Sequence, residues 1–248
     1  MVVRKFNLFE WAEITDSQIA DLADLALTEK WDFNDGEGKY RILREYLANT
    51  FTRTNLENKL YAKGGHNESE AGSIIWNTGL LGIDNTYIYM SFGKDEQDHW
   101  FLQGFFTSET VDKLFKARYL LPDKVDYFED DIDNIYINPN KCTFTFNLPG
   151  MVDKHKKQFM ELIFHLEADY SVAIPMYDVE KDEMVFALPF DMDLDGKVDC
   201  ALVVRKSTML VGIEKIYDIY EVISLENAYI NCRTIKKVNS KWLEVNNI

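Results

Sequence analysis

Cysteine is scarce in this sequence, and its few positions exclude two common roles. The cysteines are odd in number, lie far apart and lack the CxxC spacing of zinc ligands; they are Cys142, Cys200 and Cys232. A disulfide framework needs paired cysteines in a secreted chain, and a zinc site needs clustered ones. We therefore expect neither, and we expect the thiols to be buried and unreactive.

Long apolar runs are also absent. No window approaches the roughly 18 consecutive apolar residues of a membrane-spanning helix. The stretch at residues 1–16 carries charge throughout and contains no apolar core of a signal peptide. These absences predict a soluble, cytoplasmic protein with no membrane partner.

Positive charge is in short supply. The chain has 27 Lys and Arg residues against 42 Asp and Glu residues, which gives a formal net charge of −15. A protein that coats nucleic acid needs a dense positive face to neutralise phosphates, so this composition excludes that class. Any RNA or DNA site is confined to a local patch. The acidic surface also suits a protein-interaction module that docks a basic protein partner.

The motifs of the common hydrolases and nucleotide-binding enzymes are missing as well. The sequence contains no HExxH, GxSxG, GxxxxGK[ST] or GxGxxG. Its four histidines do not pair at ligand spacing, and His155 and His165 fall on different faces of one predicted helix. We therefore predict no histidine or cysteine metal site and no cofactor. Whether the chain is an enzyme stays open.

Aromatic residues, by contrast, are abundant. They make up 14% of the 248 residues and favour a sheet-rich core over a helical bundle. Apolar residues recur at helical spacing in only a few stretches. Two lie near the N-terminus, at about 15–31, where Thr15 and Gln18 form a capping box, and at about 40–51. The longest runs over about 150–170.

Alternating apolar and polar residues predict strands elsewhere. One hairpin is expected from 87–92 and 100–106, and a second from 134–138 and 142–148, with a short helix at 108–118 between them. Further extended segments follow the long helix, at about 171–177, 183–190, 198–205 and 217–223.

The hairpins and the one long central helix predict an α+β fold with a mostly antiparallel sheet. The polar stretch at 63–70 is short enough to be a loop within one domain. We therefore expect a single domain over residues 1–248. In it a helical part, 1–62, packs on an α+β body, 70–248.

One acidic segment resembles the start of a calcium-binding loop. Asp191-Met192-Asp193-Leu194-Asp195-Gly196 alternates oxygen ligands, and Asp199 stands at the ninth position. The twelfth position is Leu202, however, where such a loop needs a bidentate Glu, and both flanks predict strands. An Asp-Gly hairpin turn is the favoured explanation.

A second acidic run, at residues 129–133, concentrates four carboxylates in five positions. Phosphodiesterases and phosphatases place carboxylates around Mg²⁺, although they take them from separate strands. A solvated loop is therefore favoured. A metal-dependent phosphodiesterase or phosphatase stays an alternative function, with ligands among Asp130, Asp131, Asp191 and Asp199.

Polar residues inside apolar stretches are candidates for ligand binding. Asn77-Thr78-Gly79 interrupts an apolar run, and such a segment can hold an anion or a base edge, or simply form a satisfied turn between strands. Near the C-terminus, basic residues alternate with aromatic ones, as in grooves for single-stranded nucleic acid. A solvated edge explains this pattern more simply. The residues of this second segment are Asn227, Tyr229, Asn231, Arg233, Lys236, Lys237, Lys241 and Trp242.

Short blocks along the chain, in this order, resemble a known family. The blocks are 46–53 (YLANTFTR), 77–80 (NTGL), 173–177 (AIPMY), 187–190 (ALPF), 199–204 (DCALVV), 227–233 (NAYINCR) and 241–243 (KWL). Over residues 38–245 the chain resembles the bacterial domain-of-unknown-function family 3825, which is found fused to OST-HTH (LOTUS) domains, themselves predicted RNA binders. The resemblance implies a context of RNA metabolism and transfers no catalytic residue.

The resemblance and the polar segments together predict a domain associated with single-stranded RNA or a nucleotide. In the expected pocket the arginines contact phosphate, the asparagines contact base or ribose edges, and the tyrosine stacks on a base. The expected ligand-binding residues are Arg53, Asn77, Thr78, Gly79, Tyr177, Asn231 and Arg233.

Overall fold

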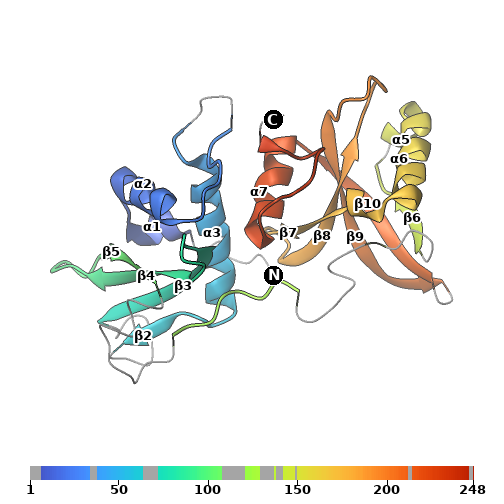
Figure 1. Cartoon of the computed structure of the whole chain (residues 1–248). Helices are drawn as coiled ribbons and strands as arrows, with labels where there is room; N and C mark the ends of the chain where they lie inside the picture. Colours follow the sequence, from blue (N-terminus) through green and yellow to red (C-terminus); the bar gives the residue numbers. More distant parts are fainter. Residues whose placement is uncertain are drawn as a thin grey trace. The chain divides into compact units, whose positions relative to one another are not determined.

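The chain divides into two compact units, Met1–Asp126 and Tyr127–Ile248, and each contains one five-stranded sheet (Figure 1). The computed structural model describes residues 7–33, 38–63, 72–107, 121–128, 137, 142–148, 150–211, 214–245 and 248. The single domain expected over residues 1–248 stays a prediction.

Some predicted segments lie outside the described residues. They are the short helix at 108–118, the acidic run at 129–133, almost all of the first arm of the second hairpin at 134–138, and nearly all of the loop at 63–70.

The first unit begins with helices α1 (Leu8–Trp11), α2 (Asp16–Leu25) and α3 (Arg41–Leu56). The predicted capping box of α2 is confirmed. The Thr15 hydroxyl accepts the Gln18 amide at 3.3 Å, and the Gln18 side-chain oxygen accepts the Thr15 amide at 2.8 Å. Both predicted N-terminal helices are confirmed as α2 and α3. α2 ends at Leu25, before the predicted end near residue 31.

The sheet of the first unit has the strand order β1-β5-β4-β3-β2. The predicted first hairpin is confirmed as β4 and β5, which pair antiparallel. Aromatic side chains pack between α3 and the sheet, where the Phe51 ring lies 5.0 Å from that of Trp76 and 6.2 Å from that of Phe92. The strands are β1 (Ala12–Glu13), β2 (Tyr61–Lys63), β3 (Ser73–Leu81), β4 (Tyr87–Lys94) and β5 (Trp100–Thr107).

The sheet of the second unit has the order β6-β10-β9-β8-β7. Each of the four extended segments predicted after the long helix contains a strand, although the first begins at Ile174 and not at residue 171. The strands are β6 (Cys142–Phe146), β7 (Ile174–Asp178), β8 (Glu183–Phe190), β9 (Cys200–Val211) and β10 (Glu214–Ile223).

The α+β class is confirmed, but both sheets are mixed. β1 pairs with β5 in parallel, and β6 pairs with β10 in parallel, while the other pairs are antiparallel. The expectation of hairpins alone missed these pairs, because each joins strands far apart in the sequence.

The predicted long central helix is interrupted. His155 has φ −119° and ψ 31°, outside the helical region, and it separates α5 (Met151–Lys154) from α6 (Lys156–Ala168). A short 3₁₀ helix, η3 (Tyr170–Val172), follows.

One helix was not predicted. α7 (Leu225–Ile235) begins at Ser224, whose hydroxyl accepts the Asn227 amide at 3.3 Å. This cap and the buried residues Ala228, Tyr229 and Cys232 at helical spacing were the available signal.

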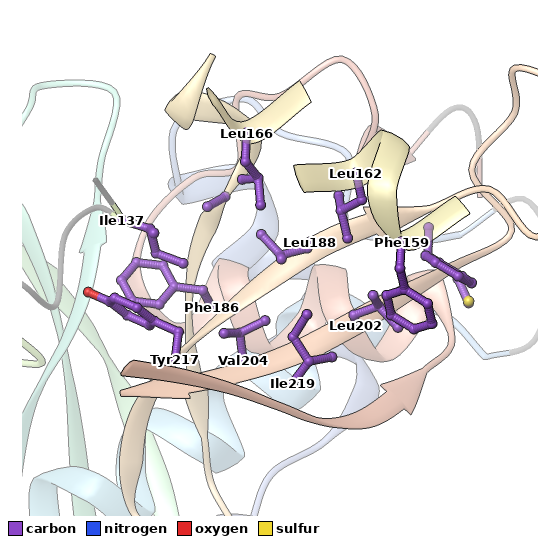
Figure 2. Packing of buried hydrophobic residues seen from close by; sticks show 13 residues of the cluster. Ile137, Phe159, Leu162, Leu166, Phe186, Leu188, Leu202, Val204, Tyr217 and Ile219 are labelled. Carbon is purple, nitrogen blue, oxygen red and sulfur yellow. The ribbon is translucent and has the colours of Figure 1, made fainter. Parts of the chain in front are cut away.

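Helices cover both faces of the second sheet, with α6 on one face and α7 on the other (Figure 1). Figure 2 shows Leu162 and Leu166 of α6 pointing towards Leu188 and Phe186 of β8, and Phe159 lying beside Leu202 of β9. The intervening strand residues, such as Val185 and Ala187, are buried as well. Because β8 and the first part of β9 are buried on both faces, residues 184–190 and 200–204 are almost continuously apolar.

Among the described residues, no helix combines the length and the apolar character needed to cross a lipid bilayer.

Candidate functional site

A cleft of about 670 Å³ lies in the second unit. One polar stripe of α6 lines it, with Gln158, Glu161 and His165 at helical spacing. The loop between β8 and β9 contributes Asp191 and Lys197. The chain segment after α7 completes the lining with Asn239, Ser240, Lys241 and Trp242.

A second cleft, of about 480 Å³, adjoins the first. The two share Ser171, Asn239 and Ser240 as lining residues. The second cleft is also lined by Lys236, Lys237 and the exposed Tyr170. We call the two clefts together the C-terminal groove, because both follow residues 236–242. Its basic and aromatic lining consists of Tyr170, Lys197, Lys236, Lys237, Lys241 and Trp242.

The helix η3 positions both aromatic residues of the groove, since Tyr170 belongs to it and Trp242 is hydrogen-bonded to it. The Trp242 indole Nε1 donates to the Val172 carbonyl at 2.9 Å, which fixes the half-buried ring. The Asp169 carboxylate accepts the Ser171 amide at 2.9 Å. Hydrogen bonding from the Ser171 side chain and from its backbone amide lowers the pKa of Asp169, which favours the charged carboxylate. The four lysines of the groove are exposed.

The loop of residues 191–199 is organised by Asp191. Its Oδ1 accepts the Leu194 amide at 2.6 Å, and its Oδ2 accepts the Gly196 amide at 2.8 Å. Desolvation alone would raise the pKa of Asp191, but the backbone donors outweigh it and the pKa is lowered. The predicted Asp-Gly hairpin turn is therefore wrong. Leu194 and Gly196 both take left-handed conformations, with φ 63° and 88°, inside a longer loop whose donors converge on one carboxylate.

This loop contains the one group of carboxylates that the described residues offer to a cation. Asp191, Asp193 and Asp195 each present an oxygen within 4.8 Å of the others. Carboxylate oxygens suit Ca²⁺ or Mg²⁺. The predicted fourth ligand, Asp199, instead accepts the Met192 amide at 2.6 Å through its Oδ2. Asp130 and Asp131 lie outside the described residues.

The predicted segment Asn77-Thr78-Gly79 lies in the first unit and forms an irregularity of β3, where the pairing with β4 shifts between Asn77 and Leu81. The Asn77 amide donates to the Pro122 carbonyl at 3.1 Å, and its oxygen accepts the Gly79 amide at 3.0 Å. The Thr78 hydroxyl donates to the Ile88 carbonyl at 2.7 Å. Both side chains are buried, and their oxygens accept backbone amides of the bulge, Asn77 from Gly79 and Thr78 from Leu80.

Arg53 lies on α3, also in the first unit. Its Nε is 2.7 Å from Glu57 Oε1, and the other oxygen of Glu57 lies 2.6 Å from Lys59 Nζ. The Arg53 and Glu57 side chains are only 13% and 14% exposed.

The remaining predicted residues lie in the second unit. Tyr177 is buried in β7, where its hydroxyl donates to Asp182 and its ring lies 4.9 Å from that of Tyr127. Arg233 is buried on α7, and Asn231 is half-buried there. None of the seven predicted residues is among the described lining residues of the C-terminal groove.

The groove was only partly visible in the sequence. Lys236, Lys237, Lys241 and Trp242 belong to the predicted basic and aromatic pattern. Tyr170, His165 and Lys197 were missed, because only the packing of α6 and the β8–β9 loop brings them to this segment.

Two of the three cysteines are buried, as expected. Cys200 and Cys232 are both free and buried. Burial, with the neighbouring Asp199 charge, raises the pKa of Cys200 to about 11, and burial raises the pKa of Cys232 as well. The side chain of Cys142 lies outside the described residues.

Sequence comparison identifies the family. The family model described as a domain of unknown function, DUF3825, matches residues 22–161 and 149–242, which together span most of the chain. The chain belongs to the DUF3825 family. No curated protein and no solved structure matches it. In this DUF3825 protein the second matched range, 149–242, contains all of the described residues that line the C-terminal groove.

Proposed function

We propose that this DUF3825 protein binds single-stranded RNA, or a nucleotide as a fragment of it, along the C-terminal groove. The observation that supports this most is the concentration of four exposed lysines with Tyr170 and Trp242 around two adjoining clefts, on a chain whose net charge is −15. Lysines neutralise phosphates, and aromatic rings stack on bases of any sequence.

The charges of the groove favour one placement of the RNA. Lys236, Lys237 and Lys241 follow one another along the segment after α7, whereas Glu161 and Asp191 belong to α6 and the β8–β9 loop. Carboxylates repel phosphates, so we expect the backbone of the RNA to follow residues 236–241. The bases then face Tyr170 and Trp242.

The family context agrees with this proposal. The resemblance that includes fusion to OST-HTH (LOTUS) domains suggests a bacterial, cytoplasmic protein of RNA metabolism. A ligand role for Arg53, Asn77, Thr78, Gly79, Tyr177, Asn231 and Arg233 stays a prediction. Because most of these side chains are buried in structural contacts, the groove lysines provide the cleaner test.

The test is a titration of fluorescently labelled single-stranded RNA, followed by anisotropy at low and moderate salt. Lys236→Glu combined with Lys237→Glu should weaken binding at least about tenfold, because two phosphate contacts become repulsive. Tyr170→Ala should weaken binding by about 1 kcal/mol or more, because stacking is lost.

Lys154→Glu combined with Lys156→Glu provides the matched control. These lysines are exposed at α5 and the start of α6, and they do not line the groove. The control makes the same change in net charge and should leave affinity within about twofold. Equal losses in both double variants, or no loss in either, would contradict a site in the groove.

A second candidate function is metal-dependent cleavage of a phosphodiester or phosphate ester. It is favoured by the three converging carboxylates of the β8–β9 loop, of which Asp191 lines the same groove. The RNA samples are therefore also run on denaturing gels with Mg²⁺, Mn²⁺ or Ca²⁺. Cleavage that requires the metal and is lost in Asp193→Asn would establish this function, and intact RNA would leave binding alone.

The acidic composition supports a third candidate function, in which the protein is an interaction module that binds a basic protein. The absence of both RNA binding and cleavage would make it the leading one.

A further inference from the structure

Helix α6 presents three different stripes along its length. Phe159, Leu162 and Leu166 face the core, and Gln158, Glu161 and His165 face the groove. The third stripe is formed by Lys157, Met160, Phe164 and Glu167, which fall within about 80° of one another at 100° per residue. All four side chains are exposed. We call these four residues the outer stripe of α6.

The centre of the outer stripe is unusually apolar for a surface. Met160 is 66% exposed and Phe164 is 67% exposed, although both are large apolar residues. They are four residues apart and therefore neighbours on the helix. Single exposed apolar residues are ordinary, but a methionine and a phenylalanine side by side are the kind of anchors that bind another helix.

The charges at the two ends of the outer stripe indicate what covers it. Met160 and Phe164 lie two residues before and after Leu162, and Lys157 and Glu167 lie five residues before and after it. A second α6 helix placed antiparallel about this midpoint therefore brings Met160 level with the partner's Phe164. The same arrangement brings Lys157 level with the partner's Glu167.

From this symmetry we infer that the outer stripe of α6 pairs with the outer stripe of a second copy of this chain. A two-fold axis that passes beside Leu162 makes the interface self-complementary. Each apolar contact and each ion pair then occurs twice, with the apolar contacts near the axis and the ion pairs at the two ends. A parallel pairing would set Lys157 against its own copy and Glu167 against its own copy, which like charges disfavour. The antiparallel helix dipoles also attract.

The area of the contact sets the expected strength. α6 has 13 residues, so one helix pair buries less than the roughly 1,200 Å² of a standard stable interface. We therefore expect a weak dimer with a dissociation constant on the order of 0.1 mM, which forms as concentration rises.

The experiment is sedimentation velocity of the full chain over about 5–500 μM, because the expected dissociation constant lies within this range. Wild-type protein should move from monomer to dimer. Phe164→Glu should stay monomeric throughout. Lys157→Glu and Glu167→Lys, each alone, should weaken the dimer about tenfold, because each sets like charges opposite one another.

The double variant Lys157→Glu, Glu167→Lys decides the geometry, since it restores opposite charges across the two-fold axis. It should dimerise within about twofold of wild type, and Lys154→Glu, outside the stripe, should have no effect. Circular dichroism of each variant confirms that α6 is intact. A monomer at every concentration, a dimer indifferent to Phe164→Glu, or a double variant as weak as the single ones would each overturn the inference.

Discussion

At the scale of single residues, a polar cluster at the end of β7 shows how burial and neighbouring charges affect the ionisation of a side chain. Asp178, 9% exposed, accepts Lys181 Nζ at 2.6 Å and the Tyr220 hydroxyl at 3.1 Å through its Oδ2. Lys181 also lies 4.5 Å from the centre of the Tyr220 ring. The cluster holds the turn between β7 and β8 against β10.

Glu183 is the member of this cluster whose charged form is unfavourable. It pairs directly across from Asp178 in the β7–β8 register, and its Oε1 is buried with no hydrogen-bond partner among the described residues. Burial, and then the Asp178 charge, raise the pKa of Glu183, while Arg205 and Lys181 lower it by less.

The raised pKa predicts a pH-dependent stability. The folded state binds the Glu183 proton more tightly than the unfolded state, so this contribution is fully present below about pH 4.5 and is lost as pH rises through the folded-state pKa. At neutral pH the ionised Glu183 is therefore unfavourable. We expect Glu183→Gln to be more stable than wild type near pH 7, with an advantage that shrinks as pH falls towards 4.

Urea unfolding of both proteins between about pH 4 and pH 8 measures this difference. Glu96→Gln changes an exposed carboxylate outside the groove and the outer stripe of α6, and it is the control for this comparison. An advantage of Glu183→Gln that stays constant across this range would contradict the assignment to ionisation.

At the scale of elements, the irregularity in β3 depends on one glycine. Gly79 has φ +74°, a left-handed conformation that other residues rarely adopt. A Cβ at this position would lie 2.9 Å from the Tyr46 hydroxyl, which donates to the Thr78 carbonyl at 2.8 Å. The bulge thus ties β3 to α3 through a contact that only glycine allows.

We expect Gly79→Ala to destabilise the protein by about 2 kcal/mol, from backbone strain and the clash together. In a Tyr46→Phe background the same substitution should be less destabilising, because the clash with the hydroxyl is removed. Thermal or urea unfolding measures both values.

Gly104→Ala in β5 is the matched control. Its backbone is not left-handed, and an added Cβ there meets no atom within 4 Å. It should be neutral or slightly stabilising. Equal destabilisation at the two glycines would show that φ and the Tyr46 contact are not the cause.

At the scale of the whole molecule, the net charge of −15 opposes nucleic acid at long range, so binding must come from local phosphate contacts. The groove offers the four lysines at 197, 236, 237 and 241. About 0.7 counterions are released per contact on a single strand. We therefore expect the logarithm of RNA affinity to fall with the logarithm of salt at a slope of about −3.

Anisotropy titrations at several salt concentrations give this slope. Removing one lysine, as in Lys241→Ala, should lower its magnitude by about 0.7. A slope near zero would mean that binding, if present, does not use phosphate contacts in the groove.

The sequence alone determined the features that depend on near neighbours. The capping box of Thr15 and Gln18, the hairpin of β4 and β5, and the bounds of β8 at 183–190 are confirmed as predicted. Caps act over three residues and strand alternation over two, so the signal lies in one short window. The basic and aromatic pattern at 236–242 was visible for the same reason.

Only the tertiary structure decided the features that join distant residues. Packing, and not local period, decided the parallel pairing of β6 with β10, the interruption at His155, and which strands α7 covers. The groove formed in the same way, since α6, the β8–β9 loop and residues 236–242 meet only after the sheet is built. The hydrophobic effect is not directional, so no short stretch of sequence encodes which distant partner buries a given apolar residue.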